Sequence, residues 1–206
     1  MAYIETGVCG PGKDDLLKSM FEARKRVFVD LLKWEVPVLN ERFEVDEFDN
    51  SHATYIIVTD TAGEHLGSAR LLETTRPHIL GSLFPQLCAE AVPAGPDVVE
   101  ITRFCLDRNL GASARRQVRN RLVSALVAHA LQSGIRTYTG VAEIAWLQQI
   151  LAFGWDCRPL GLPQYVGRRM IGALAIAVGP DTPALLNQNA IWVDEEVSET
   201  ALSQAA

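Results

Sequence analysis

Residues 98–141 read VVEITRFCLDRNLGASARRQVRNRLVSALVAHALQSGIRTYTGV, which contains a strand, a glycine turn, a long helix and a second strand. Val98–Leu106 is rich in β-branched and apolar residues and predicts the first strand of this stretch. Ser113–Ser133 is amphipathic and is followed by Gly134, a residue that favours a helix end. Arg136–Val141 predicts the next strand. Strands and helices mixed in this way are typical of α/β domains.

The sequence before this stretch predicts a helix and a hairpin. Asp14–Lys33 has one apolar stripe, which comprises Leu17, Met20, Phe21, Phe28 and Leu31. Thr54–Thr59 and His65–Glu73 are strand-like, and the turn residues 60–63 between them predict an antiparallel hairpin. We expect residues 34–50 to form a long ordered loop. We expect residues 77–93 to be a loop with a short helical turn around Leu83.

The sequence after residue 141 predicts a helix at Glu143–Phe153, closed by Gly154, and a buried apolar strand at Arg169–Val178. The predicted fold class is therefore α/β, a three-layer α/β/α sandwich. Its sheet should be mixed, because the hairpin strands run antiparallel. We expect one domain over residues 1–206, with a loosely ordered tail from about residue 190.

Composition excludes several classes of protein. The 206 residues are 48% hydrophobic and 21% charged, and the net charge of −6 disfavours a nucleic-acid partner. Met170–Val178, the longest apolar run, is too short to span a membrane, and residues 1–10 lack a secretory leader. We therefore expect a cytoplasmic protein. The four cysteines, Cys9, Cys88, Cys105 and Cys157, have no metal-ligand spacing and are interpreted as reduced core thiols.

Arg24 breaks the apolar pattern of its helix, because it lies four residues after Met20 and four before Phe28. A guanidinium that faces inward needs carboxylates or a bound anion. One interpretation is a structural ion pair that fixes the following loop, and the other is a binding site.

The loop at residues 34–50 is rich in acidic and aromatic residues. Six carboxylates lie in it, among them Glu44, Asp46 and Asp49, and Trp34 and Phe43 are interleaved with them. Carboxylates beside aromatic faces suit a cationic ligand. A solvated acidic run, with the aromatics as a hydrophobic staple, is the alternative.

Three further charged residues interrupt strands. Arg70 lies inside one strand, and Glu100 and Arg103 lie inside another. A spacing of three places Glu100 and Arg103 on opposite faces of a regular strand, so a bulge would be needed to direct both toward one site. Cross-strand salt bridges are the alternative interpretation.

The turn before the long helix contains Arg108 and Gly111 and could present backbone N–H groups to a phosphate. Arg115, Arg116 and Arg119 follow without an acidic residue. They form a basic patch that could face an acidic partner or simply solvent.

Together these residues resemble the LuxI-type acyl-homoserine-lactone synthases, the autoinducer synthases of quorum sensing. The resemblance covers residues 16–155 and rests on Arg24, Phe28, Trp34, Glu44, Asp46, Asp49, Arg70, Phe84, Glu100 and Arg103. It implies an acetyltransferase-like (GNAT-like) fold with a V-shaped split between central strands. It also implies an acyltransferase that joins S-adenosylmethionine to the acyl group of an acyl carrier protein or, less often, an acyl-CoA.

The resemblance also implies roles for individual residues. Those expected to hold S-adenosylmethionine are Arg24, Phe28, Trp34, Asp46, Asp49 and Arg103, while Arg70 belongs to the network around them. Glu44 or Glu100 could act as general base, and Arg103 is expected to take part in catalysis with them. No prosthetic group and no metal are expected.

The acyl chain needs an apolar pocket, for which the candidates are Phe84, Leu126, Thr139, Trp146, Leu147 and Ile150. A hydroxyl at Thr139 favours a 3-oxo or 3-hydroxy chain. Phosphopantetheine should lie near Arg108 and Gly111. A transient complex with the carrier protein could use Arg115, Arg116 and Arg119, since residues 143–153 carry no basic side chain.

Two other functions remain open from the sequence. One is a GNAT-like N-acyltransferase that uses acyl-CoA and another amine. The other is a sensor that binds S-adenosylmethionine or acyl-CoA without turnover.

Overall fold

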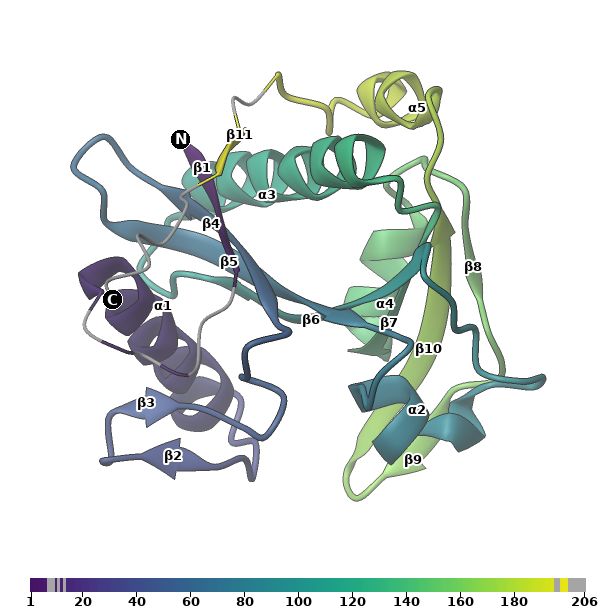
Figure 1. Cartoon of the computed structure of the whole chain (residues 1–206), viewed down its shortest axis with the longest axis horizontal. Helices are drawn as coiled ribbons and strands as arrows, with labels where there is room; N and C mark the ends of the chain where they lie inside the picture. The colour runs from purple at the N-terminus through teal and green to yellow at the C-terminus, as the bar shows by residue number, and fades with distance from the viewer. Residues whose placement is uncertain (7–9, 11, 13, 195–196, 200–206) are drawn as a thin grey trace. The chain divides into compact units, whose positions relative to one another are not determined.

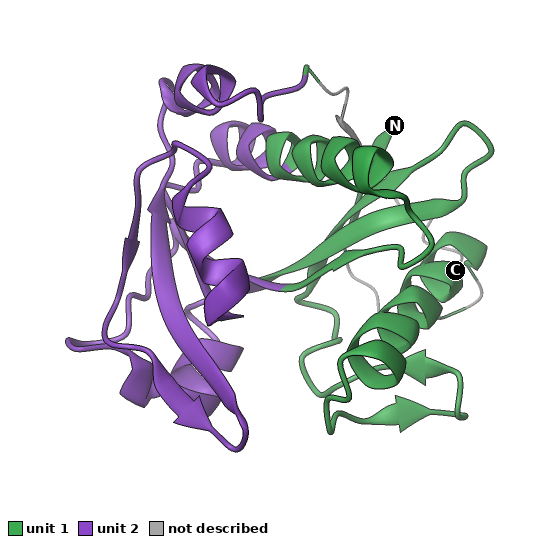
Figure 2. Cartoon of the chain, turned by 180° about the vertical axis from the view of Figure 1, so that it is seen from behind, with its two compact units in different colours: residues 1–71, 103–125, 194–206 green, residues 72–102, 126–193 purple. Residues whose placement is uncertain are grey.

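The computed structural model describes residues 1–6, 10, 12, 14–194 and 197–199, and the chain forms two compact units (Figure 2). The first unit comprises residues 1–71, 103–125 and 194–206, and the second comprises residues 72–102 and 126–193. Three elements contribute residues to both units: β5 (His65–Glu73), β6 (Val98–Leu106) and α3 (Ala112–Ser133).

The first unit is built on strands in the order β11-β1-β4-β5-β6 (Figure 1). Strand β1 pairs in parallel with β11 and antiparallel with β4, so the sheet is mixed as predicted. The remaining elements of this unit are β1 (Ala2–Thr6), α1 (Asp15–Arg24), η1 (Lys25–Leu31), β2 (Val38–Leu39), β3 (Phe43–Glu44), β4 (Thr54–Thr59) and β11 (Val197–Glu199).

Helices cover both faces of this sheet. Cys105 of β6 packs in a buried cluster with Val27 and Phe28, beside α1. A β-carbon at Gly67 would lie 2.9 Å from Val118 of α3 and 3.0 Å from Leu106, the next residue of β6. Successive strand residues point to opposite faces, so α1 and α3 lie on opposite sides of the strands, as Figure 1 shows. The predicted mixed sheet with flanking helices is confirmed.

The first helix begins as the sequence predicts and then changes its winding. The Asp14 carboxylate caps it by accepting from the backbone N–H groups of Leu16 and Leu17, at 2.8 and 3.1 Å. Residues 25–31 form a π-helix, and the Trp34 N–H donates to the Phe28 carbonyl at 2.8 Å. π-Helical turns are rare and often occur at functional sites.

Residues 34–50 contain more structure than the predicted loop. Strands β2 and β3 pair as a small hairpin, in which Val38 faces Glu44. Asn40 and Glu41 form its turn, with φ of 51° and 58°. Two-residue strands are too short to show an alternating pattern, which is why the sequence did not predict them.

The hairpin of β4 and β5 is confirmed, with Tyr55 opposite Arg70. Its turn is fixed by the Asp60 carboxylate, which accepts from the N–H groups of Ala62 and Glu64 at 2.8 and 2.9 Å. Gly63 adopts φ of 87°, a conformation that favours glycine. This hairpin places Arg70 in the interior of the first unit.

The second unit contains strands in the order β6-β7-β10-β8, with β9 also on β10. The β6 residues Val98, Val99 and Glu100 pair in parallel with β7, and the last pair is Glu100 with Thr139. The other elements of this unit are α2 (Ile79–Leu83), η2 (Pro85–Leu87), β7 (Thr137–Glu143), α4 (Ile144–Leu151), β8 (Cys157–Pro159), β9 (Gln164–Val166), β10 (Arg169–Ala177) and α5 (Thr182–Gln188).

The sequence did not predict β1, β8, β9, α5 or β11. In the expected tail, residues 197–199 form β11 beside β1, while residues 195–196 and 200–206 lie outside the described residues. No helix in the described part of the chain is long and apolar enough to cross a membrane.

Three cysteines carry free thiols in the described structure. Cys105 is buried, as predicted, whereas Cys88 and Cys157 are half-buried, and Cys9 lies outside the described residues. Burial raises the pKa of the Cys105 thiol to about 12, so it remains protonated. A protonated, buried thiol is no nucleophile.

Candidate active site

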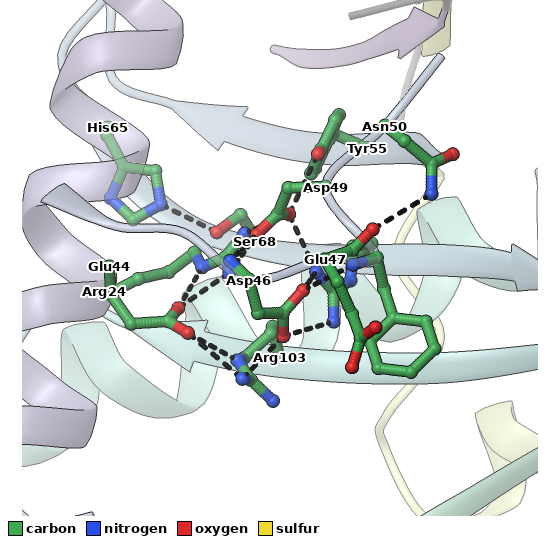
Figure 3. Close-up of polar contacts among 12 residues, drawn as sticks. Arg24, Glu44, Asp46, Glu47, Asp49, Asn50, Tyr55, His65, Ser68 and Arg103 are labelled. Atoms are coloured by element: carbon green, nitrogen blue, oxygen red, sulfur yellow. Dashed lines mark hydrogen bonds and ion pairs between the residues drawn. The ribbon is translucent and has the colours of Figure 1, made fainter. Parts of the chain in front are cut away.

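Six charged side chains of the first unit form one network, which comprises Arg24, Glu44, Asp46, Asp49, Arg70 and Arg103 (Figure 3). Three carry a guanidinium and three a carboxylate, so the network is balanced in charge. The arginines come from α1, β5 and β6, and the carboxylates come from β3 and the turn after it.

Arg24 joins α1 to the acidic segment. Its Nε donates to Glu44 Oε2 at 2.6 Å, and its two terminal nitrogens donate to the two oxygens of Asp49 at 2.8 and 2.9 Å. The residue is 1% exposed. Arg24 therefore pairs with the loop carboxylates, one of the two interpretations that the sequence allowed.

Asp49 is the most heavily bonded carboxylate of the network. Besides Arg24, it accepts from Tyr55 Oη at 2.8 Å and from the Asp46 N–H at 2.8 Å, and it lies 2.7 Å from Arg70. Its side chain is fully buried. Five donors hold this group in place, so it fixes the acidic segment against the sheet.

The charges of the network shift the pKa values of its members. Burial alone would raise the pKa of Asp49, but Arg24 and Arg70 outweigh it and hold that pKa well below its ordinary value of 3.8. Burial opposes the charge of Arg24 too, yet Asp49 and Glu44 outweigh it and raise the pKa of Arg24 above its ordinary value. Burial and the Asp49 charge raise the pKa of Tyr55, which therefore remains a donor.

Arg103 is held in a strained conformation at the edge of the network. Its backbone φ is 50°, a value that breaks the regular pleat of β6. The sequence predicts a bulge in this strand if Glu100 and Arg103 are to face one site. Arg103 Nε and Nη2 donate to Glu44 Oε1 at 3.0 and 2.9 Å, and Nη2 donates to Asp46 at 2.7 Å. Nη1 has no hydrogen-bond partner among the described residues, and the side chain is 10% exposed.

Two aromatic rings lie against the Arg103 guanidinium. Phe28 and Trp34 stack with centroids 4.7 Å apart, and the guanidinium carbon lies 5.6 and 5.9 Å from these centroids. The π-helical turn brings the two rings together, because it joins the backbones of Phe28 and Trp34. A cationic edge beside a stacked aromatic pair suits a ligand with a carboxylate and an aromatic base.

Tyr55 is a member of the network that the sequence analysis missed. It lies opposite Arg70 in the β4–β5 hairpin. The register of the predicted hairpin is the only sequence signal that could have identified it. An aromatic residue in a strand is ordinary, so its residue type drew no attention.

Glu100 lies in the second unit and is fully buried. Its Oε1 accepts from the Leu80 N–H at 2.9 Å. Thr139, its partner in the parallel ladder, is also fully buried, and its hydroxyl has no hydrogen-bond partner among the described residues. The β6–β7 ladder ends at this pair although both strands continue.

The six residues expected around an acyl chain lie on two faces of the second unit's sheet. Phe84 packs in a cluster with Val141, which shares the face of Thr139. Leu147 lies beneath Gly172, on the opposite face from Ala173 in that cluster. Leu126 belongs to α3, and its carbonyl oxygen accepts from the Tyr138 hydroxyl at 2.9 Å. Tyr138 precedes Thr139 in β7 and points to the opposite face, so Leu126 lies on the face away from Thr139. Trp146 and Ile150 lie on α4 with Leu147.

The expected phosphopantetheine and carrier-protein residues are at the surface of the first unit. Arg108, Gly111, Arg115 and Arg116 are exposed, and Arg119 is half-buried. A β-carbon at Gly111 would meet no atom within 4 Å, so packing does not require glycine there. No cluster of metal-binding side chains occurs in the described ranges.

The mixed sheet with flanking helices is the fold of the acetyltransferase-like acyltransferases. An acyl-CoA N-acyltransferase from Pseudomonas aeruginosa has this fold, with a TM-score of 0.54 and 15% identity over 87% of this chain and 99% of that one. The family model of the autoinducer synthases matches residues 12–182, and the chain belongs to that family of acyltransferase enzymes.

Two relatives support this assignment. The chain is 32% identical to an acyl-homoserine-lactone synthase of Ralstonia nicotianae over 79% of this chain and 82% of the relative. A CoA-dependent acyl-homoserine lactone synthase, BjaI, was solved with SAM and isopentyl-CoA. The two chains have a TM-score of 0.83 and 26% identity over 98% of this chain and 93% of that one.

Proposed function

We propose that this protein makes an N-acyl-L-homoserine lactone, a quorum-sensing signal, from S-adenosylmethionine and an acyl thioester. The methionyl amine loses a proton and attacks the thioester carbonyl, so that an amide forms and the thiol leaves. The methionyl carboxylate then attacks the carbon that bears the sulfonium, which closes the lactone and releases methylthioadenosine. The observation that carries the proposal is the balanced arginine–carboxylate network beside the Phe28–Trp34 stack, in a chain of the autoinducer synthase family.

Arg103 is the residue that best suits the methionyl carboxylate. Its Nη1 is the one guanidinium nitrogen there without a described protein partner, and the stacked rings beside it would border the adenosyl group. Asp46, whose side chain is 9% exposed, can face the ammonium or sulfonium. Asp49, Arg24 and Arg70 are buried and saturated, so we assign them the support of this site.

Glu100 is a better general base than Glu44. Both oxygens of Glu44 accept from arginines, Oε2 from Arg24 and Oε1 from Arg103, so both are already occupied. Glu100 accepts from the Leu80 N–H through Oε1 and lies at the end of the β6–β7 ladder, where the resemblance implies that the thioester enters. We therefore propose that Glu100 is the general base, which removes the proton of the amine directly or through a water.

The donor is an acyl-CoA or an acyl carrier protein. The CoA-dependent relative supports the first, and the basic patch of Arg115, Arg116 and Arg119 supports docking of an acidic carrier. The unpaired Thr139 hydroxyl supports a chain with a 3-oxo or 3-hydroxy group.

Free thiol release from a panel of acyl-CoA and acyl carrier protein donors tests the proposal. We expect release that depends on S-adenosylmethionine and falls about 10- to 100-fold in Asp46→Asn, because a charged contact to the ligand is lost. Release with other amines, and an unchanged rate in Asp46→Asn, would favour an ordinary GNAT-like N-acyltransferase. Binding of S-adenosylmethionine without thiol release from any donor would favour a sensor.

A further inference from the structure

A buried histidine lies beside the segment that holds Glu100. His78 precedes α2 and is 6% exposed. Its Nδ1 lies 2.8 Å from the Arg76 carbonyl oxygen, which can only accept, so Nδ1 carries the proton. The other ring nitrogen, Nε2, has no hydrogen-bond partner among the described residues. The ring is fixed by the Arg76 carbonyl and by packing.

The packing partner of this ring is Gly81. A β-carbon at Gly81 would lie 2.6 Å from Cε1, 2.7 Å from Nε2 and 3.3 Å from Nδ1 of His78. The ring of His78 therefore packs directly against the α-carbon of Gly81, and a side chain at position 81 would collide with it. The backbone at Gly81 has no positive φ, so the ring, and not the backbone conformation, requires glycine.

Leu80 lies between these two contacts and directs its N–H to Glu100. This N–H is 2.9 Å from Glu100 Oε1, and Leu80 itself is fully buried. The Ser82 N–H donates to the His78 carbonyl at 2.9 Å and closes the turn around Leu80. Upstream, the Thr74 hydroxyl donates to the Val98 carbonyl at 2.7 Å, two residues before Glu100.

We propose that His78 is a positioning residue for the reaction, which acts through Gly81 to hold the Leu80 N–H on the Glu100 carboxylate. The proposal rests on the proposed function, in which Glu100 takes the proton of the amine. Without the ring, the turn from His78 to Gly81 loses its packing partner. The N–H then moves away from Glu100, and the carboxylate loses a hydrogen bond that orients it.

Steady-state kinetics of His78→Ala, Gly81→Ala and the double variant test this coupling. We expect each single variant to lower kcat about 10-fold, the value of one hydrogen bond to a charged group. KM for S-adenosylmethionine should stay within about twofold, because the first-unit network is untouched. The double variant should be no slower than the slower single variant, since the added methyl of Gly81→Ala harms the site only when it displaces the ring. Ser82→Ala, an exposed position in the same helix, should match the wild type.

The amide resonance of Leu80 gives a readout that does not depend on activity. We expect His78→Ala and Gly81→Ala to move it in the direction that Glu100→Gln moves it, because all three weaken the same hydrogen bond. Unchanged resonances, an additive double variant, or losses confined to KM would overturn the role of His78. Those results would leave lactone formation by the wild type, and hence the proposed function, intact. A wild type that makes no lactone would instead overturn the proposed function.

Discussion

Replacing Tyr55 by phenylalanine removes one oxygen from the centre of the charged network. The hydroxyl donates to Asp49 Oδ1 at 2.8 Å, and the ring packs edge-on against Phe21 at 5.8 Å. Phenylalanine keeps the ring and its packing and removes only the donor. A hydrogen bond to a charged group contributes about 2 kcal/mol to stability. We therefore expect Tyr55→Phe to lower the free energy of unfolding by about 2 kcal/mol.

Urea unfolding at pH 7 measures this loss directly. A change of about 2 kcal/mol corresponds to a Tm lower by about 4–8 °C in a chain of this size. Tyr165→Phe is the matched control, because Tyr165 is 71% exposed and should change stability by less than about 0.5 kcal/mol. A Tyr55→Phe protein as stable as the control would refute the inference that Tyr55 supports Asp49.

Three further predictions concern other parts of the molecule. Arg103→Ala should lower kcat/KM for S-adenosylmethionine about 10- to 100-fold, measured by thiol release, since it removes the charge assigned to the methionyl carboxylate. An unchanged kcat/KM would contradict that assignment. Thr139→Val should stabilise the protein by about 1 kcal/mol in urea, because it removes a buried hydroxyl without a partner, and should lower the preference for 3-oxo over plain donors about 10-fold. A destabilised variant would mean that the hydroxyl is satisfied. Burial lowers the pKa of His65 from 6.5 to about 4; the charge of Arg26 acts in the same direction, and that of Asp107 opposes it. Between pH 4 and 6.5 the unfolded chain therefore binds more protons than the folded chain. Stability should fall as the pH falls from 6.5 to 4, and His65→Gln should flatten that dependence by roughly 3 kcal/mol.

The longer elements could be predicted from the sequence because each carries a strong local pattern. β4, β5 and β6 begin and end where alternation and turn residues place them. β8, β9 and β11 have three residues each, which is too few for any period to emerge. Such strands form because neighbouring strands pair with them, and pairing between distant segments is not encoded locally.

The charged residues of the site were visible because they violate their surroundings. Arg24 interrupts an apolar stripe and Arg70 an apolar strand, so each needed a partner. Which carboxylates pair with Arg24 depends on the path of residues 34–50, and that path includes a hairpin too short to predict. Tyr55 and His78 were missed for the opposite reason. Each is an ordinary residue in its local pattern, and only contacts across the fold give it a partner.

Mass spectrometry of the complete reaction tests the central claim most directly. Purified protein is incubated with S-adenosylmethionine and its preferred thioester donor, and all products are quantified. We expect methylthioadenosine, free thiol and an N-acyl-homoserine lactone in equal amounts, because one turnover breaks one thioester and one carbon–sulfonium bond. An acylated amine formed without methylthioadenosine would contradict lactone synthesis.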